Sequence, residues 1–314
     1  MRVFVAGATG VIGRRLLPLL TAQGHEVIGL ARSYGAAVEV EVLGAVAAEA
    51  DALDSGALSH VVKDAAPDAV VHLLTALPAK FNPRRRSRDF AQTNRLRTEG
   101  TRNLLYAAEQ AGAKRIITEG LACIYEPNTW VPAAEAAPLW RDPPRQFAPV
   151  VAALRSLEER TRQADGLVLR LGQLYGHGTI YGRHGSFVRQ VQAAKMPIVG
   201  SGDGTFSFTH VGDAASAIAA ALHSHVRGAL NVVDDDPAPV REWLPILAEL
   251  LQAPPPKHVP VALGRFSAGE WGVAFMTQLR GADNTLARRV LDWAPHYGSW
   301  RQGFAAELTH AAHP

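Results

Sequence analysis

The 314-residue chain is longer than an average domain, and its 47% hydrophobic and 19% charged residues indicate a sizeable core and exclude disorder. A formal charge of +3 over this length is too weak to indicate nucleic-acid binding, and a single cysteine, Cys123, excludes an internal disulfide. No apolar run reaches the roughly 20 residues that span a bilayer, and no leader-like segment precedes the first apolar run. We therefore expect a soluble, cytoplasmic protein.

Short apolar runs alternate with helix-length amphipathic segments through the first half of the chain. This alternation is typical of βαβ units, whose strands form a parallel sheet. We therefore predict an α/β fold with a Rossmann-type doubly wound parallel sheet. The expected strands are Arg2–Ala6, Glu26–Leu30, Ala45–Ala50, Ala69–Leu74, Arg115–Thr118 and Leu167–Leu171, and the expected helices are Val11–Gln23, Ala36–Leu43, Asp54–Ala65, Phe90–Ala111 and Pro149–Gln163.

The pattern changes after residue 171. Residues 172–186 are rich in Gly, Tyr and His and are expected to form a loop, while Val211–Leu222 predicts a helix and Leu230–Val233 a strand. The residues after 239 are mostly helical, with proline-rich breaks. We therefore expect a dinucleotide-binding domain over 1–171, to which about 205–233 return, and a smaller, mostly helical, discontinuous substrate lobe over 172–314.

A glycine-rich turn, Gly7-Ala8-Thr9-Gly10-Val11-Ile12-Gly13, follows the first predicted strand and opens the first predicted helix. Gly7 permits the tight turn, Gly10 leaves room for a pyrophosphate, and Gly13 lets the helix pack closely on the sheet. The helix N-terminus offers free N–H groups and a partial positive charge. The turn therefore predicts a dinucleotide site that includes Thr9, Val11 and Ile12. A helix-capping turn without a ligand is the alternative.

The end of the second predicted strand indicates which dinucleotide binds. An NAD site usually has an acidic residue here for the ribose 2′-hydroxyl, but this chain has Arg32. A guanidinium fits a 2′-phosphate through two hydrogen bonds, and Ser33 can donate beside it. We therefore favour NADP(H) over NAD(H), a solvated arginine being the alternative. Asp51, which closes the third predicted strand, is a candidate for the adenine amino group or for capping the next helix.

Several further segments carry a family resemblance. Each resembles a segment of one known family. Asn94 and Gly100–Leu105 resemble the helix that follows the fourth strand in that family, Leu169–Gly176 resembles its LRPGNVYG segment, and Phe208–Ala214 resembles its FVHVxDxA segment. Together with the GxxGxxG pattern of the opening turn, they resemble extended short-chain dehydrogenases/reductases, the NAD-dependent epimerase/dehydratase group. The similarity runs along nearly the whole chain.

The resemblance implies further cofactor contacts and an oligomeric state. Residues after the fourth strand and at the start of the helix that follows it would lie along the cofactor. Residues after the sixth strand would approach the nicotinamide amide. A homodimer would pair the helices Phe90–Ala111 and Pro149–Gln163, with Val150, Val151, Leu154 and Leu157 suiting either that interface or an internal core. The implied cofactor residues are Leu73, Thr75, Ala76, Asn94, Gly172, Gln173 and Leu174.

The family's catalytic residues are missing. The family uses a Tyr, a Lys four residues later and a Ser or Thr after the fifth strand, and the lysine lowers the pKa of the tyrosine. Alignment on Glu158 puts Val150 and Leu154 at the first two positions, and Gly120 and Leu121 stand where the hydroxyl belongs. The chain contains no YxxxK anywhere and resembles an atypical member of the family.

Three other residues are candidates for the chemistry. Glu119, at the end of the fifth predicted strand, has apolar neighbours that would raise its pKa and suit it to act as an acid or base. Tyr181 and His184 lie in a loop expected to line the substrate pocket, where one could donate a proton and the other titrates near neutral pH. A salt bridge for Glu119 and ordinary surface positions for the other two are the alternatives.

The remaining sequence features give weaker indications of function. The run Arg84-Arg85-Arg86-Ser87-Arg88 could attract an anionic substrate or cofactor phosphate, although a solvated loop face is the commoner meaning of such a run. It lacks interleaved aromatic residues, so we expect no nucleic-acid partner. Cys123 lies in an apolar stretch and suits packing better than nucleophilic chemistry. No residues have metal-ligand spacing, so we predict no metal site.

The favoured function is an NADP(H)-dependent oxidoreductase that acts on a small organic substrate. Hydride transfer itself needs only a positioned nicotinamide and an acceptor, although the loss of the tyrosine and lysine weakens this function and its enzymatic alternative alike. An epimerase, lyase or isomerase that retains its nicotinamide is one alternative. A non-catalytic NADP-binding sensor or regulator is the other.

Overall fold

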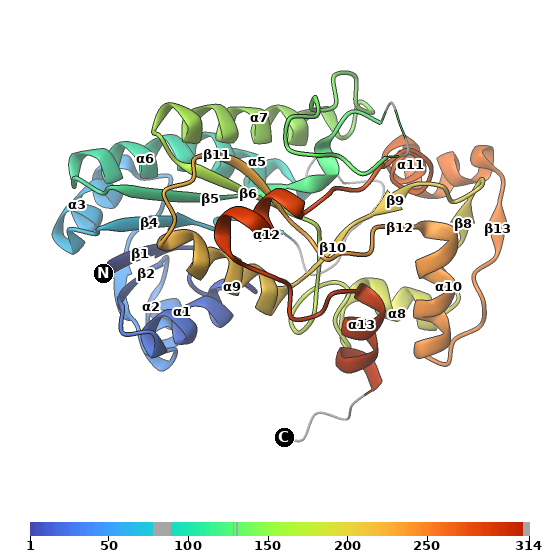
Figure 1. Cartoon of the computed structure of the whole chain (residues 1–314), viewed down its shortest axis with the longest axis horizontal. Coiled ribbons are helices and arrows are strands. Elements are labelled where there is room, and N and C mark those ends of the chain that lie inside the picture. Colours follow the sequence, from blue (N-terminus) through green and yellow to red (C-terminus); the bar gives the residue numbers. More distant parts are fainter. Residues whose placement is uncertain (78–88, 128, 130, 310–314) are drawn as a thin grey trace.

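The computed structural model describes residues 1–77, 89–127, 129 and 131–309. Its central sheet has seven parallel strands in the order β11-β6-β5-β4-β1-β2-β3 (Figure 1). The chain builds outward from β1 to β3 and then returns to the other side of β1 at β4, so the crevice of this sheet lies between β1 and β4 at their carboxyl ends. The strands are β1 (Arg2–Ala6), β2 (Glu26–Ala31), β3 (Val46–Glu49), β4 (Ala69–His72), β5 (Arg115–Leu121), β6 (Leu167–Leu171) and β11 (Gly228–Val232).

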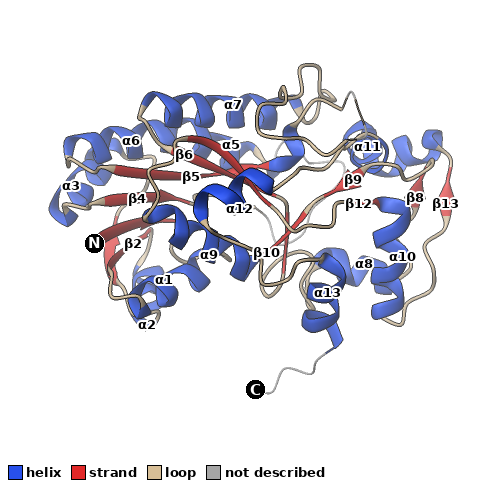
Figure 2. Ribbon diagram, in the orientation of Figure 1, coloured by secondary structure: helices blue, strands red, loops and turns tan. Residues whose placement is uncertain are grey.

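Helices cover both faces of this sheet (Figure 2). One face packs on α1 (Gly13–Ala22), α2 (Tyr34–Val42), α9 (Val211–Leu222) and α12 (Thr285–Leu291), and the other on α3 (Ser55–Ala65), α6 (Thr101–Gln110) and α7 (Ala148–Gln163). Because both faces are covered, the inner strands are almost continuously apolar, as β4 (Ala-Val-Val-His) illustrates. The predicted doubly wound Rossmann-type fold is confirmed.

The second lobe contains shorter strands and a core rich in aromatic side chains. Its large buried residues include Tyr175, Phe208, Trp243, Trp300 and Phe304. Two-stranded pairs connect its segments, β7 with β10, β9 with β12 and β8 with β13. The elements are β7 (Gln173–Tyr175), α8 (Ser186–Gln192), β8 (Ile198–Val199), β9 (Thr205–Phe206), β10 (Phe208–His210), β12 (Ala238–Pro239), α10 (Val240–Leu250), β13 (His258–Val259), α11 (Val261–Thr277) and α13 (Trp300–Thr309).

Three sequence predictions of local structure need correction. Residues 172–186 are not all loop, because Gln173–Tyr175 forms β7 and pairs with β10. Strand β5 does not end at Thr118, because its pairing with β6 continues to Leu121. The predicted helix over 90–111 is divided into α5 (Ala91–Arg95), a π-helical turn over Leu96–Gly100, and α6. Single π-turns are frequent at functional sites, and this one carries Arg97.

Helix α7 resolves one of the alternatives for the apolar residues near its start. Val150, Val151, Leu154 and Leu157 are buried within the single chain. They therefore form internal core and are not available to a dimer interface. The homodimer itself stays a prediction.

The helices of the described part of the chain include none with the length and apolar character of a membrane span.

Candidate cofactor and substrate site

The turn after β1 has the backbone geometry that its glycines predict. Gly7 has a φ of 98°, and a Cβ added there would lie 2.6 Å from the carbonyl oxygen of Leu73. A Cβ at Gly13 would lie 2.3 Å from the carbonyl oxygen of Ala8, so helix and turn approach too closely for any other residue. Gly10 is exposed, and its amide donates to the Gly7 carbonyl.

Two amides of this turn are available to a ligand. Among the described residues, no acceptor lies within hydrogen-bonding distance of the amides of Val11 and Ile12. Thr9 is partly exposed beside them, and its carbonyl accepts from the Nε of Arg14. Unpaired amides at the N-terminus of α1 are the donors that a phosphate requires, so the residues present fit a dinucleotide.

The polar residues at the ends of β2 and β3 differ in what they already bind. Arg32 is exposed directly after β2, and no described carboxylate lies within ion-pair distance of it. Ser33 caps α2, since its Oγ accepts from the amide of Ala36 at 3.4 Å. Asp51 does not close β3, which ends at Glu49, and its Oδ1 accepts from the amide of Leu53. Asp54, not Asp51, caps the following helix α3.

The segment after β4 lies along the crevice. Leu73 is buried and its amide donates to the carbonyl of Ala6, which ties this segment to the end of β1. Thr75 is exposed, and the amide of Ala76 donates to the Oγ1 of Thr93. The Oδ1 of Asn94 is buried with no hydrogen-bond partner among the described residues. Such an unsatisfied acceptor is uncommon, and a bound ligand would satisfy it.

The segment after β6 approaches both the sheet and the second lobe. Gly172 donates its amide to the Oγ1 of Thr209, and a Cβ there would lie 2.4 Å from the carbonyl oxygen of Ser207. The amide of Gln173 donates to the carbonyl of Ser207, so the backbone amides of Gly172 and Gln173 both have acceptors within the chain. The Gln173 side chain, with Leu174 beyond it in β7, lies where the resemblance places the nicotinamide amide.

The positions of the missing catalytic residues are packed as core. Val150 and Leu154 of α7 are buried in the aromatic cluster of the second lobe. A Cβ at Gly120 would lie 2.8 Å from the Cγ1 of Val168, so even a serine there would require movement. Leu121 is followed by a turn of 3-10 helix, Ala122–Ile124. The hydroxyl and amine of the family's usual acid–base pair therefore have no substitute at these positions.

Glu119 lies within β5, opposite Leu169 of β6, and not at the strand end that the sequence predicts. It keeps part of its surface exposed, yet desolvation by its surroundings raises the pKa of its carboxyl to about 7, against an opposing effect of the Arg97 charge. Arg97 belongs to the π-helical turn, is buried, and has an Nη1 without a hydrogen-bond partner among the described residues. The Glu119 carboxyl can therefore change its protonation state near neutral pH.

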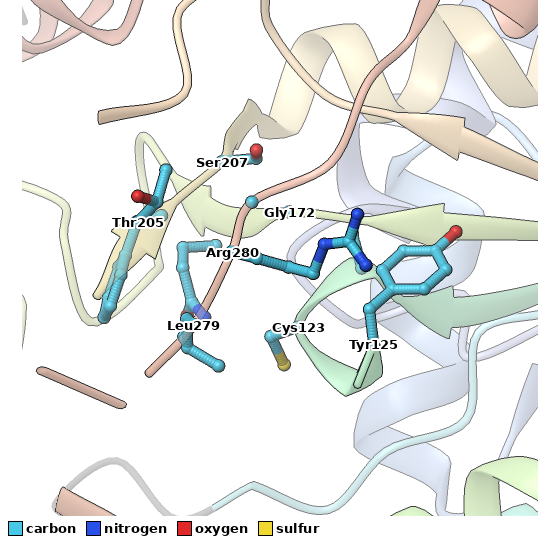
Figure 3. A pocket seen from close by; sticks show the side chains of 11 residues that line it. Cys123, Tyr125, Gly172, Thr205, Ser207, Leu279 and Arg280 are labelled. Carbon is cyan, nitrogen blue, oxygen red and sulfur yellow. The ribbon is translucent and has the colours of Figure 1, made fainter. Parts of the chain in front are cut away.

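The charge of Arg97 favours the thiolate form of Cys123, but this effect does not activate the thiol. Burial raises the pKa of the Cys123 thiol to about 12, so the sulfur is protonated at neutral pH. It lines a small cavity with Gly172, Gln173 and Phe206, in which the Arg280 side chain extends toward the Tyr125 ring (Figure 3). The Nε of Arg280 donates to the carbonyl of Val131 at 2.9 Å. Packing is thus the role that this geometry supports for Cys123.

A cleft of about 300 Å³ lies between α8, α10 and α11 in the second lobe. Gln173 and Phe206 line both this cleft and the small cavity, so the cleft extends to the segment after β6. Tyr181 lines it and is buried, and desolvation raises the pKa of the phenol, which is therefore protonated at neutral pH. His184 is exposed and is not among the lining residues. The structure thus brings Tyr181, but not His184, to the cleft.

Sequence reasoning missed most of the cleft. Its aromatic residues come from segments far apart in the chain, and the one signal in the sequence was the group of tryptophans in the last third, of which Trp243 and Trp271 line the cleft. Arg97 was missed because nothing in the sequence distinguishes it from the other arginines of its helix. The arginine run 84–88 lies outside the described residues. Among those described, no group of three or more His, Cys, Asp or Glu side chains is placed to hold a metal ion.

Comparison with known proteins assigns the chain to a family. The sequence profile described as "NAD dependent epimerase/dehydratase family" matches residues 3–232. The chain belongs to this family. It is therefore an enzyme of a group that binds a nicotinamide cofactor, and the non-catalytic alternative is set aside. The extended, atypical short-chain dehydrogenase/reductase resemblance is confirmed.

Three similar proteins illustrate the range of the family. A Streptomyces protein named 3-diazoavenalumate denitrifying reductase is 44% identical over 315 residues, which cover 98% of this chain and 100% of that protein. The structure of human epimerase family protein SDR39U1 with NADPH has a TM-score of 0.75 at 21% identity, covering 99% of this chain and 100% of that one. UDP-glucose 4-epimerase of Thermus thermophilus with NAD has a TM-score of 0.75 at 22% identity, covering 99% of this chain and 98% of that one. The two structures establish the shared fold.

Proposed function

We propose that this enzyme is an NADP(H)-dependent reductase of a small, largely apolar organic substrate. The observation that carries the proposal is the position of Gln173. This residue follows Gly172 at the carboxyl end of β6, where the family places the nicotinamide, and it also lines the cleft of the second lobe. A substrate in the cleft therefore reaches the edge of the sheet at which hydride transfer takes place.

The preference for NADP(H) rests on the end of β2. Arg32 is exposed there without a described carboxylate partner, so its guanidinium is available to a 2′-phosphate. The position after β2 carries no acidic residue that would bind the ribose 2′-hydroxyl of NAD. The presence of NADPH in the human SDR39U1 structure supports the same preference.

We propose a diazo compound as the substrate, because the Streptomyces relative that spans the whole chain is named for such a reaction. The cleft favours this class over nucleotide sugars. Its lining includes Lys195 as its one charged residue among those described, whereas a nucleotide sugar carries two phosphates and many hydroxyl groups to be bound. The same composition argues against the alternative of a nicotinamide-retaining sugar epimerase.

The proposed chemistry explains why the tyrosine and lysine are dispensable. When bound, NADPH supplies hydrogen with its electron pair to the carbon that bears a diazonium group, so that a C–H bond replaces the C–N bond, nitrogen leaves as N2, and NADP⁺ is formed. When the substrate enters as the diazonium cation, this exchange consumes no proton. The burial of Val150 and Leu154 at the vacant positions is therefore compatible with turnover.

Glu119 lines neither the cleft nor the small cavity, so within this proposal it acts on the cationic substrate group through its charge, from its position within β5. With a pKa of about 7, its carboxyl is ionised above neutral pH, and activity should increase as it loses its proton. A second candidate function follows from the same pKa. If the substrate were a ketone, the alkoxide would need a proton, protonated Glu119 could donate it, and activity should decrease as the pH rises through 7.

The test is turnover of 3-diazoavenalumate, compared with a panel of ketones and enones, using NADPH or NADH between about pH 5.5 and 8.5. We expect consumption of the diazo compound, a kcat/KM at least about tenfold higher with NADPH, and a rising pH profile with its midpoint near 7 that Glu119→Gln abolishes. Turnover of ketones alone, on a falling profile, would establish the second candidate. Absence of NADPH oxidation with every class would contradict both.

A further inference from the structure

We propose that the substrate is a planar aromatic or conjugated carboxylic acid, oriented by Lys195. This inference rests on the proposed function, since it takes the cleft to be the substrate site. It adds the residue that binds the acid group, the walls that hold the planar body and the direction of binding. The acid group would lie at the exposed Lys195, and the reducible group would lie toward Gln173.

Seven of the described residues that line the cleft are aromatic. Phe206 lies 5.1 Å from Trp243, which lies 5.7 Å from Phe187, and these rings form one group. Trp271 lies 4.9 Å from Phe90 and 5.6 Å from Phe275, which form the other. All distances are between ring centroids. Offset and tilted rings at these separations stack favourably on a further flat ring.

Lys195 supplies the charge. It follows α8, is exposed, and is the one charged side chain among the residues that line the cleft. No described carboxylate lies within ion-pair distance of its ammonium group, although its backbone amide donates to the carbonyl of Gln190. A single cation in a largely apolar cleft favours a ligand with an anion at one end and an apolar body.

The position of Lys195 also determines orientation. A carboxylate held at the exposed end stays partly hydrated, so the ion pair forms without the cost of full desolvation. The apolar body then occupies the aromatic walls, and the far end of the molecule lies at Gln173, beside the predicted nicotinamide position. Reversed binding would put the carboxylate among Phe206, Trp243 and Phe275, where it would lose its hydration without a cationic partner.

The experiment measures binding of trans-cinnamate to the full chain by quenching of tryptophan fluorescence, with NADP⁺ present and absent. The neutral trans-cinnamamide, which has the same shape, is the ligand control. Lys195→Gln removes the charge, Lys195→Arg keeps it, and Lys114→Gln removes an exposed lysine at the start of β5, at the other end of the sheet. Binding is a readout that does not depend on turnover, so it separates this inference from the proposed reaction.

We expect wild-type chain to bind cinnamate at least about fivefold more tightly than cinnamamide, with a difference that shrinks at high salt. Lys195→Gln should remove the difference, while Lys195→Arg and Lys114→Gln should keep it. Equal affinity for the two ligands, a difference that persists in Lys195→Gln, or absence of binding would overturn the inference. Selective cinnamate binding without any diazo or ketone reduction would uphold it and contradict the proposed function instead.

Discussion

Arg170 of β6 and Glu158 of α7 form a two-point ion pair, with Nη2 to Oε2 at 2.7 Å and Nε to Oε1 at 2.8 Å. The same guanidinium donates to the hydroxyl of Tyr125 at 2.7 Å, and that hydroxyl donates to the Oδ1 of Asn231. Helix α7 has lost the tyrosine and lysine of its family but is still tied to the sheet through charged groups. Its position beside β5 and β6 is thus preserved without the catalytic pair.

Glu158→Ala should lower the free energy of unfolding by about 3–5 kcal/mol, because it leaves the buried Arg170 charge without its partner. Urea denaturation measures this. Glu159→Ala is the matched control on the same helix, since Glu159 is exposed and pairs with Arg162 at the surface. We expect that control to unfold nearly as the wild type does. Equal losses in the two variants would contradict the structural role assigned to Glu158.

Gly7→Ala should destabilise the fold and weaken NADPH binding more than tenfold, because its Cβ would meet the Leu73 carbonyl oxygen at 2.6 Å. Gly24→Ala controls for backbone conformation, as Gly24 has a φ of 81° with nothing within 4 Å of the added Cβ. A positive φ costs a non-glycine residue about 1–3 kcal/mol. The control should therefore lose stability while it keeps its affinity for NADPH. Tight NADPH binding by Gly7→Ala would show that the turn tolerates a side chain.

Arg32→Ala should reduce the preference for NADPH over NADH by at least about tenfold, by removing the guanidinium that would bind the 2′-phosphate. The dissociation constants of both nucleotides, measured by fluorescence titration, give the ratio. Arg227→Ala removes another exposed arginine, beside Asp165 at the start of β11, and should leave the ratio unchanged. An unchanged ratio in Arg32→Ala would assign the preference to other residues.

His72 should remain neutral well below the pH at which ordinary histidines titrate. Its Nδ1 accepts from the Leu74 amide, so Nε2 carries the proton and donates to the Oγ1 of Thr101, and burial lowers its pKa from 6.5 to about 4. The folded state therefore disfavours the protonated form. The contribution of His72 to the free energy of unfolding is fully present above pH 6.5. It decreases by up to about 3 kcal/mol as the pH falls from 6.5 through 4.

Histidine titration followed by NMR checks this directly. The His72 ring should stay neutral at pH 5.5. In His72→Gln, the part of the acid destabilisation that His72 contributes should disappear. A His72 resonance that titrates near the ordinary histidine value of about 6.5 would contradict the assigned hydrogen bonds.

The sequence predicts the dinucleotide half of the molecule well because its signals are local. The strand, the turn from Gly7 to Gly13 and the following helix are contiguous, and steric requirements determine which residues the turn accepts. Glu119 was selected correctly as a residue with a perturbed pKa, but its neighbour Arg97 belongs to a π-helical turn that no pattern in the sequence predicts. Local propensity cannot reveal a contact between residues of different elements.

The second lobe could not be predicted to the same extent. Tyr181 and His184 are three residues apart in the chain, yet one is buried in the cleft and the other is exposed. Their difference arises from Phe187, Phe208 and Trp243, which pack around Tyr181 from α8, β10 and α10. The cleft is a product of tertiary packing, so its lining appears only once the short strands and helices are assembled.

The most direct test of the proposed reduction follows the hydrogen atom. The chain is incubated with 3-diazoavenalumate and NADPH deuterated at the transferred position of the nicotinamide, and the product and N2 are analysed by mass spectrometry. We predict one N2 released for each NADPH oxidised, and one deuterium on the carbon that carried the diazo group. A product whose new hydrogen comes from the solvent, or nucleotide oxidation without N2 release, would contradict it.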